Sequence, residues 1–399
     1  MKKNKTVPTI RFFEFSDAWE QHNVGDFLTV SKIPGHTGVD AKKLTVKLWG
    51  KGVVEKTDLY GGSENTQYYI RRAGQFMYGK LDFLHAAFGI VPENLDKFES
   101  TLDSPAFDLN GIDAHFLLNR VTQEDFYLKH GLVANGSRKA KRIHEDAFMT
   151  MPILVPPLAE QQRIGNYFVS LDRLIALHQN KLEKMQQVRE LLLNQLFTGL
   201  GRKFPEIRFA GNQEEWKLLS LRNIVTSYTD YLPTPVDGYT RLGIRSHMKG
   251  TFYDYVAPSK KLGEKRLQRV KRDNLIVNIV FAWEHAIAVT TEEDEGKLVS
   301  HRFPQFSFNE GMYPMFFRYA LSDPRFRHHL FLASPSGAGR NKTLRIDEMM
   351  DYQLRVPEYE EQKKIAGCLE TVDHLIGLYE MELEKIRNVK SACLQGMFV

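Results

Sequence analysis

The chain has 399 residues, of which 42% are apolar and 26% charged, and its formal net charge is +5. This length accommodates two or three domains, and the composition is that of an ordinary globular protein. It excludes a transmembrane helix, because no apolar run approaches the roughly 18 residues that a bilayer span requires. The lysine-containing N-terminus lacks the apolar centre of a signal peptide, so we expect a cytoplasmic protein with no membrane partner.

The first of four predicted segments, residues 1–156, is a lead-in followed by a globular stretch. The lead-in contains the sequence PTIRF at 8–12. Within the globular stretch, YYIRRAGQFMYGKL at 68–81 is strand-like, and ANGSRKAKRI at 134–143 is a basic loop. Such clusters of Lys and Arg can neutralise phosphates, although a solvated protein surface has the same composition.

Residues 157–200 form the second segment, a predicted long helix. The Val-Pro pair before it prevents a helix from running in from the preceding residues, and Glu160 favours the positive end of the helix dipole. Apolar residues then recur with the alternating spacing of four and three that is typical of a heptad seam. The seam contains Ile164, Phe168, Leu171, Ile175, Leu182, Met185, Leu192 and Leu196, with polar interruptions at His178 and Arg189.

Residues 201–357 repeat the order of lead-in and globular stretch. The sequence PEIRF at 205–209 matches the lead-in of the first half. A strand-like basic stretch, RVKRDNLIVNIV at 269–280, and a basic Gly- and Ser-containing loop, SPSGAGRNKTLRI at 334–346, follow in the same order. Between them, YPMFFRYALSDPRFRHHLFLA is predicted to be helical with a break at Pro324.

Residues 358–399 form the fourth segment, a second long helix that repeats the first. Aligning Val155 with Val356 gives identical residues at 15 of 43 positions. The seam recurs as Ile365, Leu369, Val372, Ile376, Tyr379, Leu383, Ile386, Lys390, Cys393 and Met397. Internal repetition on this scale predicts a protein made of two similar halves.

One helix cannot bury a heptad stripe by itself, so we expect the two long helices to pack on each other. Pairing between two similar halves predicts approximate two-fold symmetry, and therefore antiparallel helices. The alternative is that each helix packs only on its own globular part. The predicted fold class is mixed α/β (α+β), with two globular domains separated by two long antiparallel helices that form a coiled-coil spacer with a pseudo-two-fold internal repeat.

The order of two globular parts and two long helices resembles the DNA-specificity (S) subunit of a type I restriction–modification enzyme. The resemblance covers the whole chain and is carried mainly by the starts of the helices and the apolar stripe that follows them. The matching residues are Pro156, Glu160, Gln161 and Ile164 in the first helix, and Pro357, Glu361, Gln362 and Ile365 in the second.

This resemblance implies a function and a set of partners. Each globular part would be a target recognition domain that contacts one half of a bipartite, asymmetric sequence in double-stranded DNA. The helices would set the gap and dock two modification subunits, which methylate adenine, and restriction (endonuclease) subunits would join the assembly. The chain itself would be non-catalytic and hold no cofactor or metal, since S-adenosylmethionine, ATP and Mg²⁺ would bind the partner subunits.

The residues themselves agree with a non-catalytic role. No GxGxxG precedes a helix, and the NPP[FY] tetrapeptide of adenine methylases is missing. SGAGRNKT at 336–343 departs from the Walker phosphate loop, because Asn341 stands where that pattern requires glycine. Two other readings stay open. One is a coiled-coil adaptor that binds only proteins, and the other is a self-sufficient methylation or restriction enzyme with an unrecognised active site.

DNA contacts are expected from the basic strands and loops, because Arg and Asn pair bidentately with guanine and adenine and Gly lets the backbone approach closely. The candidates in the first globular part are Arg71, Arg72, Lys80, Ser137, Arg138, Lys139 and Arg142. Those in the second are Arg269, Lys271, Arg272, Asn278, Ser336, Arg340, Asn341, Lys342 and Arg345. The interface between helices, or with a partner, is expected at Ile164, Leu171, Ile175, Leu182, Met185, Ile365, Val372, Ile376, Leu383 and Ile386.

Overall fold

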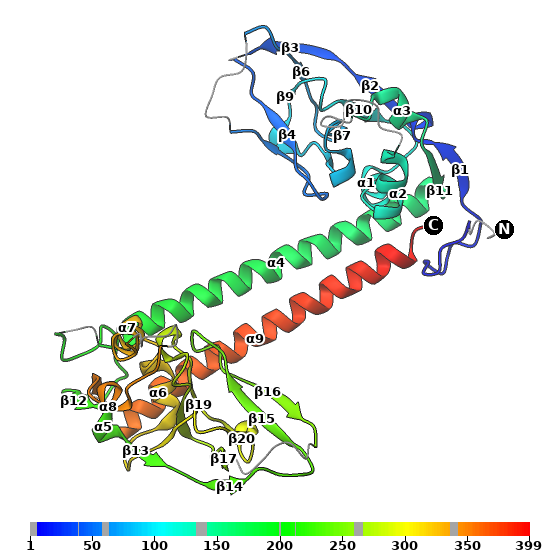
Figure 1. Ribbon diagram of the computed structural model, residues 1–399. Helices are drawn as coiled ribbons and strands as arrows, with labels where there is room; N and C mark the ends of the chain where they lie inside the picture. Colours follow the sequence, from blue (N-terminus) through cyan, green and yellow to red (C-terminus); the bar gives the residue numbers. More distant parts are fainter. Residues whose placement is uncertain are drawn as a thin grey trace. The chain divides into compact units, whose positions relative to one another are not determined.

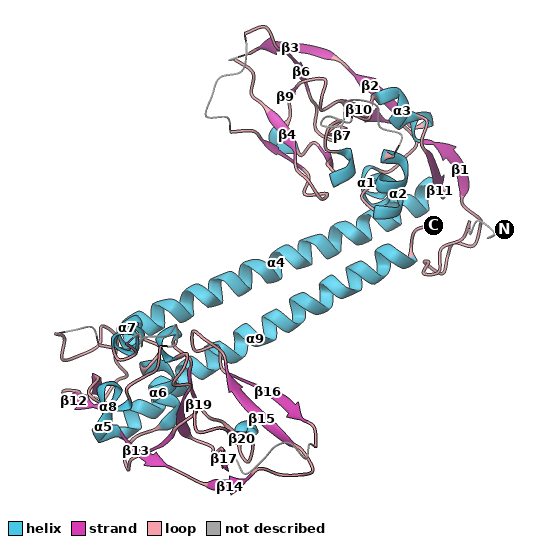
Figure 2. Cartoon of the chain, viewed as in Figure 1, coloured by secondary structure: helices cyan, strands magenta, loops and turns pink. Residues whose placement is uncertain are grey.

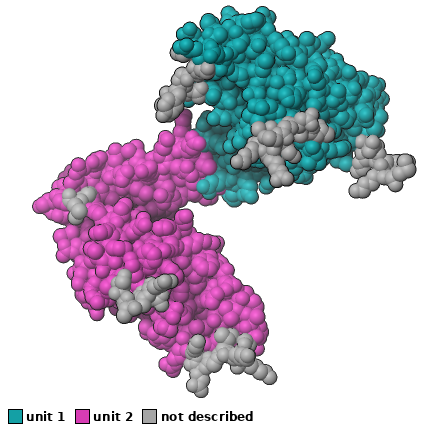
Figure 3. Space-filling view, turned by 45° about the horizontal axis from the view of Figure 1, so that its top comes forward, with its two compact units in different colours: residues 1–181, 379–399 teal, residues 182–378 magenta. Residues whose placement is uncertain are grey.

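The chain divides into two compact units, which Figure 3 shows in different colours. One unit contains residues 1–181 and 379–399, and the other contains residues 182–378. Each unit therefore has one globular part and a portion of both long helices. The computed structural model describes residues 6–38, 40–57, 64–132, 142–198, 201–211, 213–258, 266–335 and 342–399.

The first domain, residues 20–155, is built from small antiparallel sheets (Figure 2). A four-stranded sheet has the order β2-β10-β7-β8, a three-stranded sheet the order β3-β6-β9, and two further pairs are β1-β11 and β4-β5. The strands are β1 (Glu20–Asn23), β2 (Leu28–Ser31), β3 (Ile33–Thr37), β4 (Leu44–Val46), β5 (Val53–Glu55), β6 (Gln67–Ile70), β7 (Phe76–Tyr78), β8 (Phe88–Ile90), β9 (Glu99–Ser100), β10 (Ala106–Leu109) and β11 (Pro152–Val155).

The first domain also contains short helices. They are α1 (Ala114–Val121), α2 (Glu124–Gly131) and α3 (Glu145–Met149), with the 3₁₀ helices η1 (Val24–Asp26), η2 (Phe83–His85) and η3 (Glu93–Leu95). In Figure 1, α1 and α2 lie next to the start of the first long helix, whereas α3 lies beside β2. Helix α1 begins at an N-cap aspartate, Asp113, whose side chain accepts a hydrogen bond from the backbone of Phe116. Buried aromatic residues such as Phe76, Phe107 and Phe148 form the core beneath these helices.

The second domain, residues 217–356, repeats the four-stranded sheet and the first strand pair, whereas its counterparts of β3-β6-β9 and β4-β5 join in one five-stranded sheet. Its sheets have the orders β13-β21-β18-β19, β12-β22 and β14-β17-β20-β15-β16. The strands are β12 (Lys217–Ser220), β13 (Val225–Tyr228), β14 (Tyr231–Pro233), β15 (Tyr239–Ile244), β16 (Thr251–Val256), β17 (Arg266–Arg269), β18 (Asn274–Val277), β19 (Ile287–Val289), β20 (Leu298–Val299), β21 (Gln305–Phe308) and β22 (Gln353–Val356).

The helices of the second domain follow the predicted pattern. They are α5 (Leu221–Ile224), α6 (Pro314–Ala320), α7 (Pro324–Leu332) and α8 (Ile346–Met350), with η4 (Ala282–Glu284) and η5 (Glu292–Asp294). The predicted helical break at Pro324 is confirmed, because α6 ends at Ala320 and α7 starts at the proline. Proline lacks a backbone N–H and is tolerated at the first turn of a helix, where Asp323 caps the free end.

The two long helices are α4 (Leu158–Leu196) and α9 (Tyr359–Gly396). In the first unit, Phe168 near the start of α4 shares a core with Phe398, just beyond the end of α9. In the second unit, Leu196 at the end of α4 shares a core with Leu369 near the start of α9. In both units, therefore, the start of one long helix packs with the end of the other. Every helix within the described residues is too polar or too short to span a bilayer.

Candidate nucleic-acid interface

The helix seam is buried or half-buried along its whole length, as the heptad pattern predicts. Ile164, Leu171, Ile365, Val372 and Leu383 are buried. The remaining predicted interface positions are half-buried: Ile175, Leu182, Met185, Ile376 and Ile386. The two long helices contact each other within each unit, for example through Tyr167 and Cys393 in the first and Arg189 and Asp373 in the second. The alternative in which each helix packs only on its own domain is therefore wrong.

Two reciprocal ion pairs define the direction of the helix pairing. In the first unit, Lys390 of α9 lies 2.5 Å from Asp172 of α4. In the second unit, Arg189 of α4 lies 2.5 Å from Asp373 of α9. The repeat offset of 201 relates Arg189 to Lys390 and Asp172 to Asp373, so the two ion pairs are the same contact formed twice. Helices related in this way run antiparallel, and the polar interruptions of the seam belong to the pairing.

A buried ion pair joins each lead-in to the start of a long helix. In the first unit, both carboxylate oxygens of Glu160 accept hydrogen bonds of 2.7 Å from the Arg11 guanidinium. In the second, Glu361 accepts the same two bonds from Arg208. The glutamate carboxylates are fully or almost fully buried, and this hydrogen bond raises the pKa of each arginine. The glutamate of each helix motif thus binds the arginine of PTIRF or PEIRF and connects the lead-in to the long helix.

The glutamine of the same motif joins the long helix to the globular domain. The Gln161 side chain accepts from the backbone of Asp113 (2.9 Å) and donates to the carbonyl of Pro156 (2.9 Å). In the second unit, Gln362 accepts from Tyr313 (2.8 Å) and donates to Pro357 (2.9 Å). A side-chain amide can satisfy a backbone donor and acceptor at once, which holds each domain at a defined place on its helix.

Each lead-in also contacts the end of the other long helix of its unit. The backbone N–H of Ile10 donates to the carbonyl of Gly396 on α9 (2.8 Å), and that of Ile207 donates to Gln195 on α4 (3.0 Å). Residues 195 and 396 are equivalent in the helix repeat, so these are again one contact formed twice. Each lead-in therefore bridges the start of one long helix and the end of the other.

Three of the predicted DNA contacts are buried inside their domains, which removes them from the candidates. The Arg71 side chain is fully buried and donates to the Ser100 hydroxyl (2.8 Å) and the Ser31 carbonyl (2.9 Å). Its pKa falls to about 10 because of burial, so it stays charged at neutral pH. Lys80 is buried against Glu145 at 2.8 Å. The Asn278 side chain is 9% exposed and accepts a hydrogen bond from the backbone N–H of Val280.

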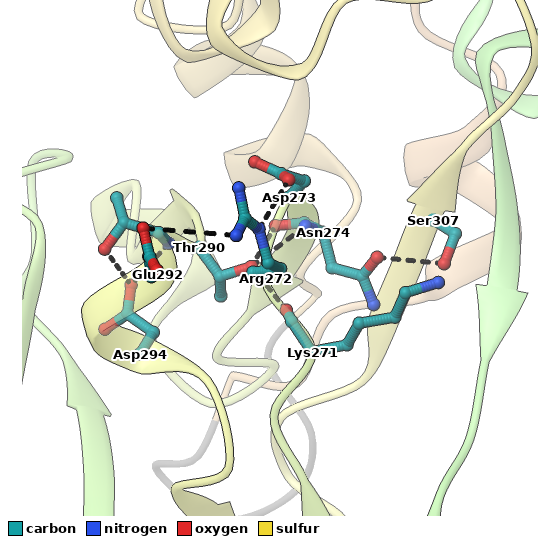
Figure 4. Close-up of polar contacts among 9 residues, drawn as sticks. Lys271, Arg272, Asp273, Asn274, Thr290, Glu292, Asp294 and Ser307 are labelled. Carbon is teal, nitrogen blue, oxygen red and sulfur yellow. Dashed lines mark hydrogen bonds and ion pairs between the residues drawn. The ribbon is translucent and has the colours of Figure 1, made fainter.

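Two other predicted cations, Arg72 and Lys271, are exposed in equivalent turns. The turn with Arg72 joins β6 to β7, and the turn with Lys271 joins β17 to β18. In Figure 4, Lys271 extends away from the neighbouring acidic residues, and its ammonium lies 5.1 Å from the ring of Tyr228. Both side chains stay candidates for phosphate contacts, because they are exposed.

In the same turn, Arg272 points toward acidic residues, unlike Lys271 (Figure 4). Its guanidinium donates to Asp273 at 3.1 Å and lies 4.0 Å from Glu292. The hydrogen bond to Asp273 raises the pKa of this exposed arginine. Asn274, next in the chain, is buried and accepts from the Ser307 hydroxyl (2.9 Å), which anchors the turn to the sheet.

Three further predicted arginines also lie near carboxylates. Arg269 is 3.5 Å from Asp230, and Arg345 is 2.7 Å from Glu348. Arg142 lies 3.4 Å from Asp103. Each pair is solvent-accessible, where an ion pair contributes about 1 kcal/mol or less, so a DNA phosphate could replace the carboxylate. These residues stay candidates.

Lys342 lies between two aromatic rings of the second domain. Its ammonium is 4.8 Å from the ring centroid of Trp283 in η4 and 4.0 Å from that of Phe331 in α7. The indole N–H of Trp283 donates to Val280, so the ring has a fixed orientation. Cation–π contacts of this kind orient a lysine without cancelling its charge.

The remaining predicted contacts lie outside the described residues, so their positions stay predictions. They are Ser137, Arg138 and Lys139, between α2 and α3 in the sequence, and Ser336, Arg340 and Asn341, between α7 and α8. Among the described residues, no group of His, Cys, Asp and Glu side chains is arranged to hold a metal ion.

Sequence reasoning missed two sets of residues. The first set is Arg11 and Arg208, which belong to the repeated PTIRF and PEIRF motifs but were not predicted to pair with a glutamate of a long helix. The second set is a pair of β-hairpin turns, at 47–52 and 245–250. A comparison of LTVKLWGKG at 44–52 with LGIRSHMKG at 242–250 would have revealed it, because both contain a cation at the fourth position and Lys-Gly at the end.

No family model matches the chain. It is 22% identical over 294 residues to the type I restriction enzyme MjaVIII specificity subunit of Methanocaldococcus jannaschii, an alignment that covers 70% of this chain and 68% of that protein. It is 21% identical over 329 residues to the putative type I restriction enzyme MjaX specificity subunit of the same organism, covering 75% and 73%.

One solved structure has the same fold. The S subunit of a type I restriction–modification system from M. genitalium matches with a TM-score of 0.61 at 14% sequence identity, covering 98% of this chain and 99% of that one. The resemblance to type I specificity subunits therefore extends from the helix motifs to relatives with that name and to the fold of an S subunit.

Proposed function

We propose that this chain is the DNA-specificity subunit of a type I restriction–modification enzyme and recognises an asymmetric bipartite target. Each domain reads one half-site, and the paired helices set the length of the unread gap. The observation that carries the proposal is the duplication of one architecture. The same strand order in the four-stranded sheet, the same Glu and Gln contacts at the helix start, and the same ion pair between helices occur in both units.

A difference between the domains supports an asymmetric target. The two domains keep the same frame but differ in the side chains that the frame exposes, for example Arg72 in one and Lys271 in the other. Contacts to phosphates supply affinity independently of sequence, whereas contacts to base edges discriminate. Two different sets of exposed side chains on one frame are what two unlike half-sites require.

We further propose that two modification subunits and the restriction subunits bind this chain, and that S-adenosylmethionine, ATP and Mg²⁺ bind only to them. In support, the long helices expose large apolar side chains outside their seam. On the first unit these include Leu177 (48% exposed) and Met381 (61% exposed). A shallow groove of about 440 Å³ on α9 is lined by Met381, Glu384, Lys385, Asn388, Val389 and Ala392. Exposed apolar stripes on a helix are typical of a protein-binding surface.

The proposal is tested by mapping adenine methylation in the source cells with and without this gene. We expect a bipartite motif that disappears on deletion. Exchanging residues 20–155 with residues 217–356 should then reverse the order of the half-sites and leave the gap nearly unchanged, because the helices are retained. A methylome that is identical with and without the gene contradicts the proposal.

Two measurements separate the proposal from its alternatives. If the isolated chain transfers a labelled methyl group from S-adenosylmethionine to DNA, it is an enzyme and not a passive reader. If neither the chain nor its complex with a modification subunit shows salt-dependent DNA binding, the chain is a protein adaptor.

A further inference from the structure

The hairpin β4–β5 of the first domain ends in a strained, exposed turn. The turn comprises residues 47–52, which we call the first tip. Trp49 has a φ of 61°, in the left-handed region that a large side chain rarely adopts, and Gly50 and Gly52 have φ of 63° and 81°. The indole of Trp49 is nevertheless 57% exposed, so the strain does not serve to bury it.

The hairpin β15–β16 of the second domain ends in the same turn, residues 245–250, which we call the second tip. His247 has a φ of 61° and Met248 a φ of 51°, followed by Gly250 at 84°. The turn closes on itself in the same way, because the N–H of Arg245 donates to Gly250 (2.9 Å) as that of Lys47 donates to Gly52 (2.9 Å). His247 is exposed, and Met248 packs against the core.

Both tips are fastened to a 3₁₀ helix by two backbone hydrogen bonds. In the first domain, Trp49 and Gly50 donate to the carbonyls of His85 and Ala86 (2.7 and 2.8 Å). In the second, His247 and Met248 make the same bonds to η4, at 2.8 and 3.0 Å. These bonds hold the left-handed backbone in place, and backbone strain that is maintained in this way tends to occur at functional sites.

The tips share their charges and differ in their rings. The first has Lys47 and Lys51 on either side of Trp49, and the second has Arg245 and Lys249 on either side of His247; all four cations are exposed. The second tip is also fastened to the helix that contains Trp283, whose ring lies 4.8 Å from the ammonium of Lys342. The backbone and the cations are the same in both tips, whereas the exposed ring differs. This combination is what a protein that recognises two different DNA sequences requires.

We propose that the two tips are specificity-determining elements that enter a groove of the DNA, one in each half-site. The flanking cations contact phosphates, and the ring of Trp49 or His247 contacts the base pairs between them. Trp49 offers an apolar plane that can pack on a base edge or a thymine methyl group, and His247 offers a hydrogen-bonding ring. This inference rests on the proposed DNA-specificity function and assigns the residues that carry it out.

The test uses Trp49→Gly and His247→Gly in the full chain, each introduced into the chromosomal gene. Glycine adopts these φ values without strain, so the thermal unfolding midpoint of either variant should equal or exceed that of the unmodified protein. In the methylome, Trp49→Gly should relax the base preference of one half-site by about tenfold or more. His247→Gly should relax only the other half-site, and the gap should stay the same in both.

A second pair of variants tests the cations. Lys47→Gln with Lys51→Gln should weaken binding of the assembled complex to duplex DNA and reduce the slope of log affinity against log salt by about two. Lys129→Gln on α2 serves as the control for loss of a lysine charge, because this lysine is exposed and lies outside both the candidate DNA contacts and the groove on α9. It should leave that slope unchanged.

The outcomes distinguish the two proposals. If deletion of the gene removes a bipartite motif but both glycine variants retain it at full preference, the tips do not read DNA and the proposed function stands. If deletion of the gene changes nothing, both proposals fail. A half-site relaxed by only one of the two variants supports the inference and shows which domain reads that half.

Discussion

The two domains share a backbone frame, but the first has buried cations at positions where the second has apolar residues. The N–H of Lys97 donates to the carbonyl of Arg71 (2.8 Å). Its counterpart, Gly296, donates to the carbonyl of Val270 (2.9 Å), so Arg71 and Val270 occupy the same place. Arg71 is fully buried and Val270 is 1% exposed. The position is therefore a core position, and its charge in the first domain has a structural role.

Lys80 shows the same relationship. Ile143 donates to the carbonyl of Lys80 (3.1 Å), and Leu344 donates to the equivalent Ile279 (2.9 Å). The first domain thus satisfies a buried cation with Glu145, where the second domain has an isoleucine. A basic residue near a strand of such a domain cannot be assigned to DNA from its charge alone, because the side chain can be buried. An apolar counterpart in the other half indicates that the position is buried.

The largest expected effect comes from exchanging the residues at the equivalent positions 71 and 270. Val270→Arg would place a charge in the second domain without the hydroxyl acceptor that Ser100 provides for Arg71, at a cost on the order of 4 kcal/mol or more. Hydrogen exchange resolved by peptide should show unfolding of residues 217–356 while the first domain stays protected. Protection that stays the same in both domains would mean that the two sites are not equivalent.

The reverse exchange, Arg71→Val, should cost the first domain about 3 kcal/mol, because the acceptors at Ser31 and Ser100 lose their donor. At a temperature where the variant is folded, its DNA affinity should match that of the unmodified chain. A loss of affinity with normal stability would return Arg71 to the DNA contacts. Arg72→Gln is the matched control, since it changes the exposed neighbour and should affect affinity but not stability.

The two lead-ins form the same Arg–Glu contact and so offer a second comparison between the halves. Arg11→Ala and Arg208→Ala each leave a buried glutamate without its partner, and we expect each to cost about 3 kcal/mol. Hydrogen exchange should increase by a similar amount in residues 6–19 of Arg11→Ala and in residues 203–211 of Arg208→Ala, because the two contacts have the same geometry. An increase in only one of the two lead-ins would show that the contacts are not equivalent.

Acid should destabilise the second domain more than the first. His285 occupies the left-handed position that Ala86 occupies in the first domain, and burial lowers its pKa from the usual 6.5 to about 4. The unfolded chain therefore binds a proton that the folded chain excludes. The stability is complete above pH 6.5 and falls as the pH drops towards 4, by about 2–3 kcal/mol.

The measurement is the unfolding midpoint of each domain between pH 7 and pH 4.5. His285→Asn keeps a residue that tolerates a left-handed backbone but does not titrate, so it should flatten the pH dependence of the second domain. A slope unaffected by this substitution would assign the acid sensitivity to other groups.

The smallest expected effect concerns the reciprocal ion pairs of the helices. Lys390→Ala or Arg189→Ala should each cost about 0.5 kcal/mol, because the pairs are partly solvent-exposed. Asp172→Lys combined with Lys390→Asp should restore most of that loss in the first unit. If the double variant is no more stable than the single ones, the pairs contribute to the register of the helices without stabilising them.

The candidate site was only partly predictable from the sequence. The basic strands led to Arg72 and Lys271, which are exposed, and equally to Arg71 and Lys80, which are buried. Alternation along a short strand does not indicate which face is covered, because that depends on which other sheet or helix packs there. The tips were missed for a related reason: a left-handed tryptophan or histidine has no signature in single-sequence reasoning.

What the sequence by itself determined is the duplicated plan and the pairing of the helices. A heptad seam repeated at an offset of 201, with Arg189 and Lys390 at matching interruptions, requires a partner helix of the same kind, since an apolar stripe is unstable in water. Tertiary structure alone decided which cations are available to a ligand and which residues fasten each lead-in. Those outcomes depend on contacts between residues far apart in the chain, such as Arg11 with Glu160, and no local pattern encodes such a contact.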